Sequence, residues 1–257
     1  MKKFIFLTTA LLAFSTASIF AQIGVPSVKN VKGPNKDKVE VYSITFTYPA
    51  EDIAAAIKER LENEGLSGKK EKNNFVSYKG IRYNYLWDKT FDFYISITGS
   101  KTAGTIDLLV SQGYDNYVDV KNDDMGKRAS KWLLSLEQTI KEYRYNVALT
   151  KETEGKVETT KTLAKLEKEQ KKYENILRKN EEKQKAFDAK KTIVTGGNVP
   201  TINNETFQKE KKELEKIQEE KNKYQYKLEE VKRKISMTQT DLKNREKSID
   251  ELKQAKP

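Results

Sequence analysis

The sequence predicts an α+β protein in which a small antiparallel sheet, with two helices on one face, is followed by a long antiparallel α-helical coiled-coil hairpin. Within residues 38–149, short segments alternate apolar and polar residues with a period of two, and two helical patterns accompany them. Within residues 150–257, apolar residues recur every three or four positions on both sides of a single break rich in Gly, Asn and Pro. The two halves therefore differ in architecture.

The N-terminus has the pattern of a secretory signal peptide. Two lysines precede an apolar run from Phe4 to about Phe20, and cleavage is expected between Ala21 and Gln22. We expect a signal peptide over residues 1–21 and a flexible leader over residues 22–37. The mature protein is then exported, with the periplasm favoured over the extracellular space, and it has no integral membrane span after cleavage.

The α+β domain begins with a strand and a helix. Residues 39–47 are rich in β-branched and aromatic residues. Alternation places three of them on one face: Tyr42, Ile44 and Phe46. Pro49 suits the first position of a helix, where no amide donor is needed, and Gly65 is expected to end that helix. Its buried stripe is expected to be Ile53, Ile57 and Leu61.

The rest of this domain is expected to form a meander of antiparallel strands followed by a helix. Strands are expected at residues 75–78, 81–87, 91–97 and 105–111. Lys79 and Gly80 are expected to form the first turn, and the short connections predict an antiparallel sheet of four or five strands. The final helix is expected from about Asp124 to Leu149. Its apolar spacing is set by Trp132, Leu136, Ile140, Tyr143 and Val147.

The order strand, helix, several strands, helix, together with the Tyr-rich second hairpin, resembles a known group of domains. These are the exported domains of unknown function with a TATA-binding-protein-like fold that recur in bacterial envelope proteins. The resemblance covers residues from about Lys38 to Leu149. It implies a small twisted sheet with helices on one side and brings no catalytic residues.

Seven-residue repeats are present on both sides of the break. Helices are expected at about residues 157–193 and 204–254, with a tip at residues 195–203. The first repeat runs through Leu163, Leu166, Gln170, Tyr173, Leu177, Asn180, Gln184, Phe187, Lys191 and Val194. The second runs through Phe207, Glu210, Leu214, Ile217, Lys221, Tyr224, Leu228, Val231, Ile235, Thr238, Leu242, Arg245, Ile249 and Leu252. The helix-breaking residues of the tip are Gly196, Gly197, Asn198 and Pro200.

A helix with one narrow apolar seam needs a partner, and the chain supplies one by returning on itself. Folding about Val199 places Tyr173 opposite the region of Tyr224 and Leu163 opposite Ile235. The C-terminal part of the second helix then packs near the end of the α+β domain or against a second protomer.

The composition argues against common catalytic chemistry. The chain contains no His and no Cys, which removes imidazole and thiol nucleophile chemistry. The acidic stretch from Asp115 to Asp124 lacks the spacing of a calcium loop and suits the start of a helix. We expect no catalytic, cofactor or metal site, and no enzyme.

Tyrosines of the sheet offer a candidate recognition surface. Tyr83, Tyr85 and Trp87 share a face with Ile81 and are expected in the core. The opposite face carries three residues that form the candidate surface: Tyr94, Arg82 and Asn84.

These features favour an exported, non-catalytic structural or adaptor protein of the bacterial cell envelope. The hairpin would bind an envelope protein or self-associate. The alternative is a glycan- or peptide-binding module that uses the aromatic sheet face, with the hairpin as spacer or oligomeriser. The net charge of +11 lies mostly in the second half, where both signs are interleaved, and we expect no nucleic-acid partner.

Overall fold

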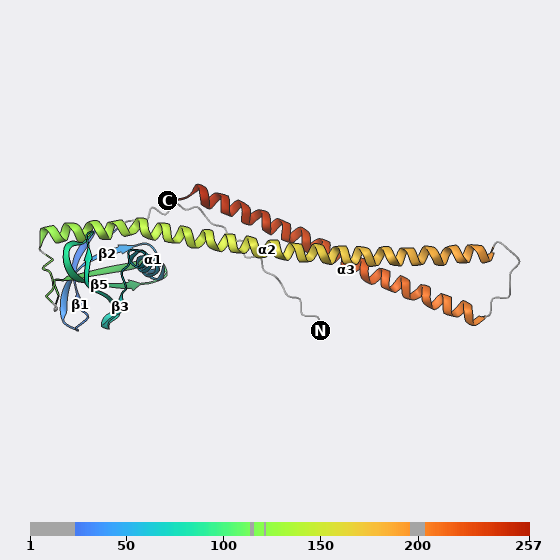
Figure 1. Ribbon diagram of the computed structural model, residues 1–257, viewed down its shortest axis with the longest axis horizontal. Helices are drawn as coiled ribbons and strands as arrows, with labels where there is room; N and C mark the ends of the chain where they lie inside the picture. The colour runs from blue at the N-terminus through green and yellow to red at the C-terminus, as the bar shows by residue number, and fades with distance from the viewer. Residues whose placement is uncertain (1–23, 114–115, 121, 196–203) are drawn as a thin grey trace. The chain divides into compact units, whose positions relative to one another are not determined.

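The computed structural model describes residues 24–113, 116–120, 122–195 and 204–257 (Figure 1). It divides the chain into two compact units, Met1–Arg144 and Tyr145–Pro257. We call them the α+β unit and the hairpin unit. Within the described residues, no helix is both long enough and apolar enough to cross a membrane.

The α+β unit contains a six-stranded antiparallel sheet. Its strands are β1 (Ser27–Lys32), β2 (Lys38–Phe46), β3 (Lys69–Lys70), β4 (Phe75–Tyr83), β5 (Trp87–Gly99) and β6 (Gly104–Ser111). The order across the sheet is β1-β2-β6-β5-β4-β3, and each neighbouring pair is antiparallel. The α+β class is confirmed, and the predicted number of four or five strands is too low.

The additional edge strand β1 comes from the segment expected to be a flexible leader. It pairs with β2 from Ser27 opposite Ser43 to Lys32 opposite Lys38. Its pattern is weak because an edge strand buries little: Val28 is exposed, and only Val31 packs against a core cluster. A strand held by backbone pairing at an edge leaves almost no hydrophobic signal in the sequence.

The predicted turn at Lys79 and Gly80 is wrong, because β4 continues through it as a bulge. Gly80 has φ +65°, the pairing register shifts between Tyr78 and Ile81, and the Gly80 amide donates to Asp92 Oδ1 at 2.7 Å. The chain turns later, at residues 84–86, so that Tyr83 pairs with Trp87. A glycine with positive φ suits a bulge as well as a turn, and the sequence does not distinguish them.

Helix α1 (Ala50–Asn63) follows the prediction closely. It begins after Pro49, and it buries Ile53, Ile57 and Leu61. Gly65, with φ +80°, ends it, and the next amide, that of Leu66, donates to the Leu61 carbonyl at 2.8 Å. This pairing satisfies a carbonyl that the helix end would otherwise leave without a partner. A short 3₁₀ turn, η1 (Lys72–Asn74), precedes β4.

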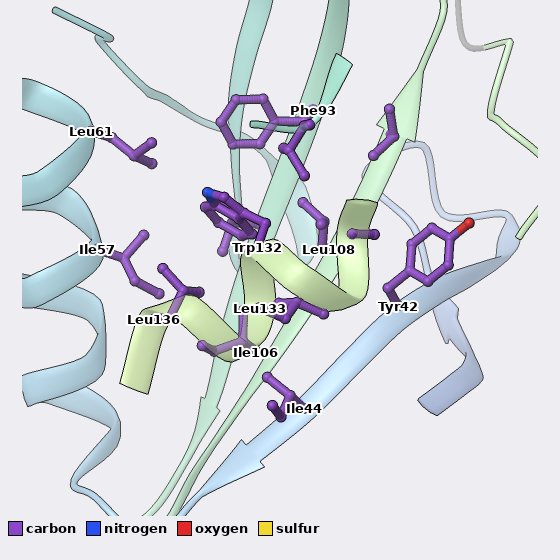
Figure 2. Close-up of a cluster of buried hydrophobic side chains, with 14 of the residues drawn as sticks. Tyr42, Ile44, Ile57, Leu61, Phe93, Ile106, Leu108, Trp132, Leu133 and Leu136 are labelled. Atoms are coloured by element: carbon purple, nitrogen blue, oxygen red, sulfur yellow. The ribbon is translucent and has the colours of Figure 1, made fainter. Parts of the chain in front are cut away.

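The main core lies where α1 and the first turns of α2 (Asp123–Thr195) share one buried cluster with one face of the sheet. In Figure 2, Leu61 of α1 and Trp132 and Leu133 of α2 belong to the same cluster as strand residues. The Trp132 Nε1–H donates to Tyr83 Oη at 3.1 Å, and the Trp132 ring packs edge-on against Phe93. Burial raises the pKa of the Tyr83 hydroxyl, and it raises that of Tyr42 to about 12.

The other face of the sheet holds a smaller apolar cluster of Val39, Val41, Phe75, Tyr94 and Leu109. Asn73 of η1 donates from Nδ2 to the Gly33 carbonyl at 2.6 Å, which joins η1 to the β1–β2 turn. Both faces of the sheet therefore carry buried apolar side chains.

The hairpin unit pairs α2 with α3 (Asn204–Gln254). Helix α2 is continuous across residues 150–156, where the sequence analysis separated two helices. The predicted tip residues Gly196, Gly197, Asn198 and Pro200 lie outside the described residues. The side chains of residues 190–207 are also outside them.

The predicted seven-residue repeat is confirmed by burial. In α2, each repeat position from Leu163 to Phe187 is half-buried or buried, whereas the positions between them are largely exposed. In α3, the same holds from Leu214 to Leu252, and only Glu210 departs from the pattern among the repeat positions with described side chains.

Contacts between the helices confirm the antiparallel hairpin and its pairing. The rings of Tyr173 and Tyr224 lie 5.7 Å apart, as the fold about Val199 predicts. Asn180 lies 3.5 Å from Glu220, and Thr159 donates to Asp241 at 3.0 Å. The members of each pair are nearly equidistant in sequence from the predicted tip.

Candidate functional site

The three predicted recognition residues do not form one exposed patch. Tyr94 lies on the face away from α1, as expected, but it is only 2% exposed and packs in the smaller apolar cluster. The register places it opposite Ser77, several residues from Arg82 along β4. Arg82 and Asn84 are exposed. The buried Tyr94 ring is therefore not displayed with them.

Tyr85, expected in the core, is 63% exposed. It lies in the turn between β4 and β5, where strand alternation no longer decides which face a side chain takes. The Arg60 guanidinium lies 5.6 Å from the centre of its ring. Arg60 is held there by donating to Ser135 and Thr139 of α2, at 3.1 and 3.0 Å. Tyr83, by contrast, is buried as predicted.

The acidic stretch before α2 serves the helix start. Asn122 Oδ1 accepts the Met125 amide at 3.1 Å, which is the geometry of an N-cap. Among the described residues, no group of three or more acidic side chains is arranged to hold a metal ion. Asp115 lies outside the described residues.

The hairpin seam contains a polar cluster at the C-terminal end of α3. Arg245 Nη1 lies 3.4 Å from Glu152 Oε2, and Arg245 Nε lies 3.2 Å from Asp241 Oδ2. Asp241 also accepts the Thr159 hydroxyl. We call Glu152, Gly155, Thr159, Asp241 and Arg245 the polar layer.

Gly155 makes room for this layer. A Cβ atom built on Gly155 would collide with Nη1 of the Arg245 guanidinium. Glycine inside a helix costs roughly 1 kcal/mol relative to alanine, so its presence here requires a local reason. The flexible end of the Arg245 side chain occupies the space that a Cβ atom would take, and this contact depends on how the two helices are aligned.

A second polar position in the seam is Asn180, which is 3% exposed and faces Glu220. A buried polar residue at a repeat position lowers stability but favours one alignment of two helices over its neighbours, because a shift leaves its amide without a partner. Asn180 and the polar layer thus specify the register of the hairpin at two separated points.

The outward side of α3 carries exposed residues of the types that dominate protein interfaces. Tyr226 is 73% exposed and Met237 is 57% exposed, and Arg233, also exposed, lies between them. The spacings of seven and four residues place all three on one stripe of the helix. We call Tyr226, Arg233 and Met237 the α3 stripe. The sequence analysis missed it because it followed only the seam.

Comparison with known proteins gives no relative: no family model, no curated protein and no solved structure matches this chain. The resemblance to envelope domains with a TATA-binding-protein-like fold stays a prediction.

Proposed function

We propose that the chain is an exported, non-catalytic structural or adaptor protein of the bacterial cell envelope that uses its helical hairpin for protein–protein interaction. The observation that carries this proposal is the α3 stripe on a helix whose seam is already occupied. Because α2 covers the seam of α3, Tyr226, Arg233 and Met237 are not needed to hold the hairpin together.

The chemistry of the α3 stripe supports a protein partner. Tyr, Arg and Met are enriched at protein interfaces, where each provides a large contact area. Glu230, on the same side of the helix, is already paired with Lys234 at 2.9 Å, which lowers the pKa of its carboxyl. The partner surface would then have an apolar centre for Tyr226 and Met237 and an acidic group for Arg233.

The fixed alignment of α3 along α2 also supports a docking role for the hairpin. A helical spacer would tolerate a shift of one helix along the other, whereas a docking surface requires residues of α3 to be presented in one position. Asn180 and the polar layer favour one position. The absence of His and Cys from the sequence and the signal-peptide pattern support the non-catalytic and exported parts of the proposal.

The test is photo-crosslinking from the α3 stripe in cells that produce the full chain. A photoreactive residue replaces Tyr226 in one variant and Asn175, an exposed residue of α2, in a matched control. A discrete protein adduct from position 226 that is lost in Met237→Ala, and is not formed from position 175, supports the proposal. Identical adducts from both positions, or none from position 226, contradict it.

The alternative of a glycan- or peptide-binding module has one observation in its favour. The ring of Tyr85 is exposed and lies beside Arg60, and the side chains of Arg82 and Asn84, close to Tyr85 in sequence, are also exposed. Exposed tyrosine rings next to hydrogen-bonding side chains suit a sugar or an extended peptide. Saturable binding to a glycan or peptide array that is abolished by Tyr85→Ala, and retained in Tyr226→Ala, would favour this alternative.

A further inference from the structure

The outward side of α2 differs from that of α3 in the sign of its charge. Between residues 161 and 185, the positions of the repeat that point away from the seam carry seven lysines and one arginine, with Glu182 as the one acid among them. We call this surface the basic strip. Its first half contains Lys161, Lys165, Lys168 and Lys171. Its second half contains Lys172, Arg178, Lys179 and Lys185.

Apart from Glu182, the acidic residues of the same stretch lie beside the seam. Glu167, Glu174 and Glu181 each follow a seam residue directly and precede a strip cation by four residues, so they lie between the seam and one edge of the strip. The positions that point farthest from the seam are thus mostly basic, and the acids lie mainly along the edges of the strip. On α3, by contrast, acids and bases alternate along the outward side, as in Lys212, Glu215, Lys216 and Glu219.

The charges of the basic strip are largely uncompensated. Within the described part of the chain, none of its seven lysines forms an ion pair, and only Arg178 does, with Glu182 at 2.9 Å. Elsewhere in the described part of the hairpin unit, Lys156 pairs with Glu246 and Lys234 with Glu230, each at 2.9 Å, but most other lysines also form no ion pair, so the strip is distinguished by how closely its cations are grouped. Exposed cations of one sign without internal partners create a positive potential that attracts an anion.

The strip is also continuous. Each of its cationic side chains is exposed, and it extends over about 36 Å at 1.5 Å per residue. At its middle lies an open, shallow depression lined by Lys168, Lys171, Lys172 and Lys179 around Asn175 and Ile176. A long, narrow row of point charges fits a linear polyanion better than a compact one.

We propose that the basic strip binds an anionic polysaccharide laid along α2. This site goes beyond the proposed function and does not depend on it, because it lies on the other helix from the α3 stripe. Its cations follow one another at intervals of one to six residues, a rise of at most about 9 Å, so carboxylate or sulfate groups along an extended chain can each meet a cation.

The residues of the strip favour a polysaccharide over other polyanions. No aromatic residue points outward from it, so nucleic-acid bases have no ring on which to stack. It also lacks the large apolar side chains with which a surface helix enters a bilayer. Seven of its eight cations are lysines. A lysine acts as a point charge and lacks the planar guanidinium with which arginine makes two hydrogen bonds to one phosphate.

The test measures binding of the full mature protein to two immobilised probes, polygalacturonate and heparin. In the test variant, Lys168, Lys171, Lys172 and Lys179 are all replaced by Gln. In the control variant, the same four-charge reduction is made on α3 at Lys209, Lys212, Lys216 and Lys223, which are also exposed. Far-UV circular dichroism of both variants checks that the helices remain formed.

We expect the test variant to bind about tenfold or more weakly, with a shallower dependence of affinity on salt, because fewer counterions are released. The control variant is expected to bind almost as tightly as the original. Equal losses in both variants would overturn the proposal, because net charge alone would then explain binding. It would also be overturned if duplex DNA or vesicles containing anionic lipid bound more tightly than both polysaccharides.

Discussion

The core of the α+β unit and the seam of the hairpin unit bury apolar residues in different ways. In the α+β unit, Phe93, Leu133 and Leu136 are fully buried between two helices and a sheet. In the hairpin unit, most apolar repeat residues are only half-buried, and Val231, Ile235 and Ile249 are the buried ones among those described. A core residue is enclosed on all sides, whereas a seam residue faces a single neighbouring helix.

Stability and specificity therefore come mainly from different parts of the molecule. Enclosed residues contribute the full free energy of transfer from water, and their removal leaves a cavity. Half-exposed seam residues contribute less each, so the hairpin depends on many of them in a row. Polar groups such as Asn180 then matter more for alignment than for stability.

The largest expected effect is that of Trp132→Ala. It should lower the free energy of unfolding of the α+β unit by about 3–5 kcal/mol, because it opens a cavity and leaves the buried Tyr83 hydroxyl without its donor. The chain has two tryptophans, and Trp87 remains to report on this unit by fluorescence during denaturation. Far-UV circular dichroism, dominated by the long helices, should show a much smaller change. Equal shifts of both signals would contradict a separate response of the two units.

Alkaline pH should also act mainly on the α+β unit. The pKa of Tyr42 is raised to about 12, first by burial and second by the charge of Asp119. Because the folded pKa lies above the ordinary value of 10.0, this contribution to stability is complete below that pH and is lost as pH rises towards 12. A shift of this size corresponds to roughly 2–3 kcal/mol. Denaturation followed by Trp fluorescence over this pH range measures it.

Tyr42→Phe is the control for this titration. It removes the ionisable hydroxyl, which donates to the Val120 carbonyl at 3.3 Å, and keeps the ring in the core. The loss of stability between neutral and alkaline pH should become smaller. An unchanged pH profile would show that other groups account for the alkaline response.

In the seam, Ile235→Ala should lower the stability of the hairpin unit by about 2 kcal/mol, the low end for a buried aliphatic residue. Ile235 is 9% exposed, whereas Met237 on the same helix is 57% exposed. Met237→Ala is therefore the matched control and should change stability by less than about 0.5 kcal/mol. Thermal unfolding followed by far-UV circular dichroism compares the two. A similar loss from both replacements would mean that the repeat does not define the seam.

The smallest expected effect tests the polar layer by a double-mutant cycle. Gly155→Ala gains helix propensity of about 1 kcal/mol but displaces Arg245, so the single change should be close to neutral. In an Arg245→Met background the guanidinium is gone, and Gly155→Ala should now be stabilising. The coupling, on the order of 1 kcal/mol, is read from four unfolding curves. If Gly155→Ala changed stability equally in the original chain and in Arg245→Met, Gly155 would not act by leaving room for Arg245.

The seam and α1 could be predicted from the sequence because their signals are local. A repeat of seven residues identifies the buried positions of α2 and α3 whatever their partner is, and the break at residues 195–203 implies the antiparallel return. Likewise, Pro49, the stripe of Ile53, Ile57 and Leu61, and Gly65 suffice to define α1. The pairing of Tyr173 with Tyr224 followed from counting alone.

The sheet and the surfaces were decided by the tertiary structure. Whether Gly80 forms a turn or a bulge depends on the pairing of β4 with β5, and that pairing also turns Tyr85 outward. Tyr94 is buried because Val39, Val41, Phe75 and Leu109, far from it in sequence, meet on the same face.

The periodicity of each segment, the lack of imidazole and thiol side chains, and the antiparallel return of the hairpin all follow from the order of the residues along the chain. Periodicity depends only on the local rise and rotation of a helix or strand, which neighbouring residues specify. The tertiary structure alone decided which side chains of different segments meet, such as Gly155 with Arg245 and Trp132 with Tyr83. It also decided which faces remain exposed, because burial depends on contacts between residues far apart in the chain.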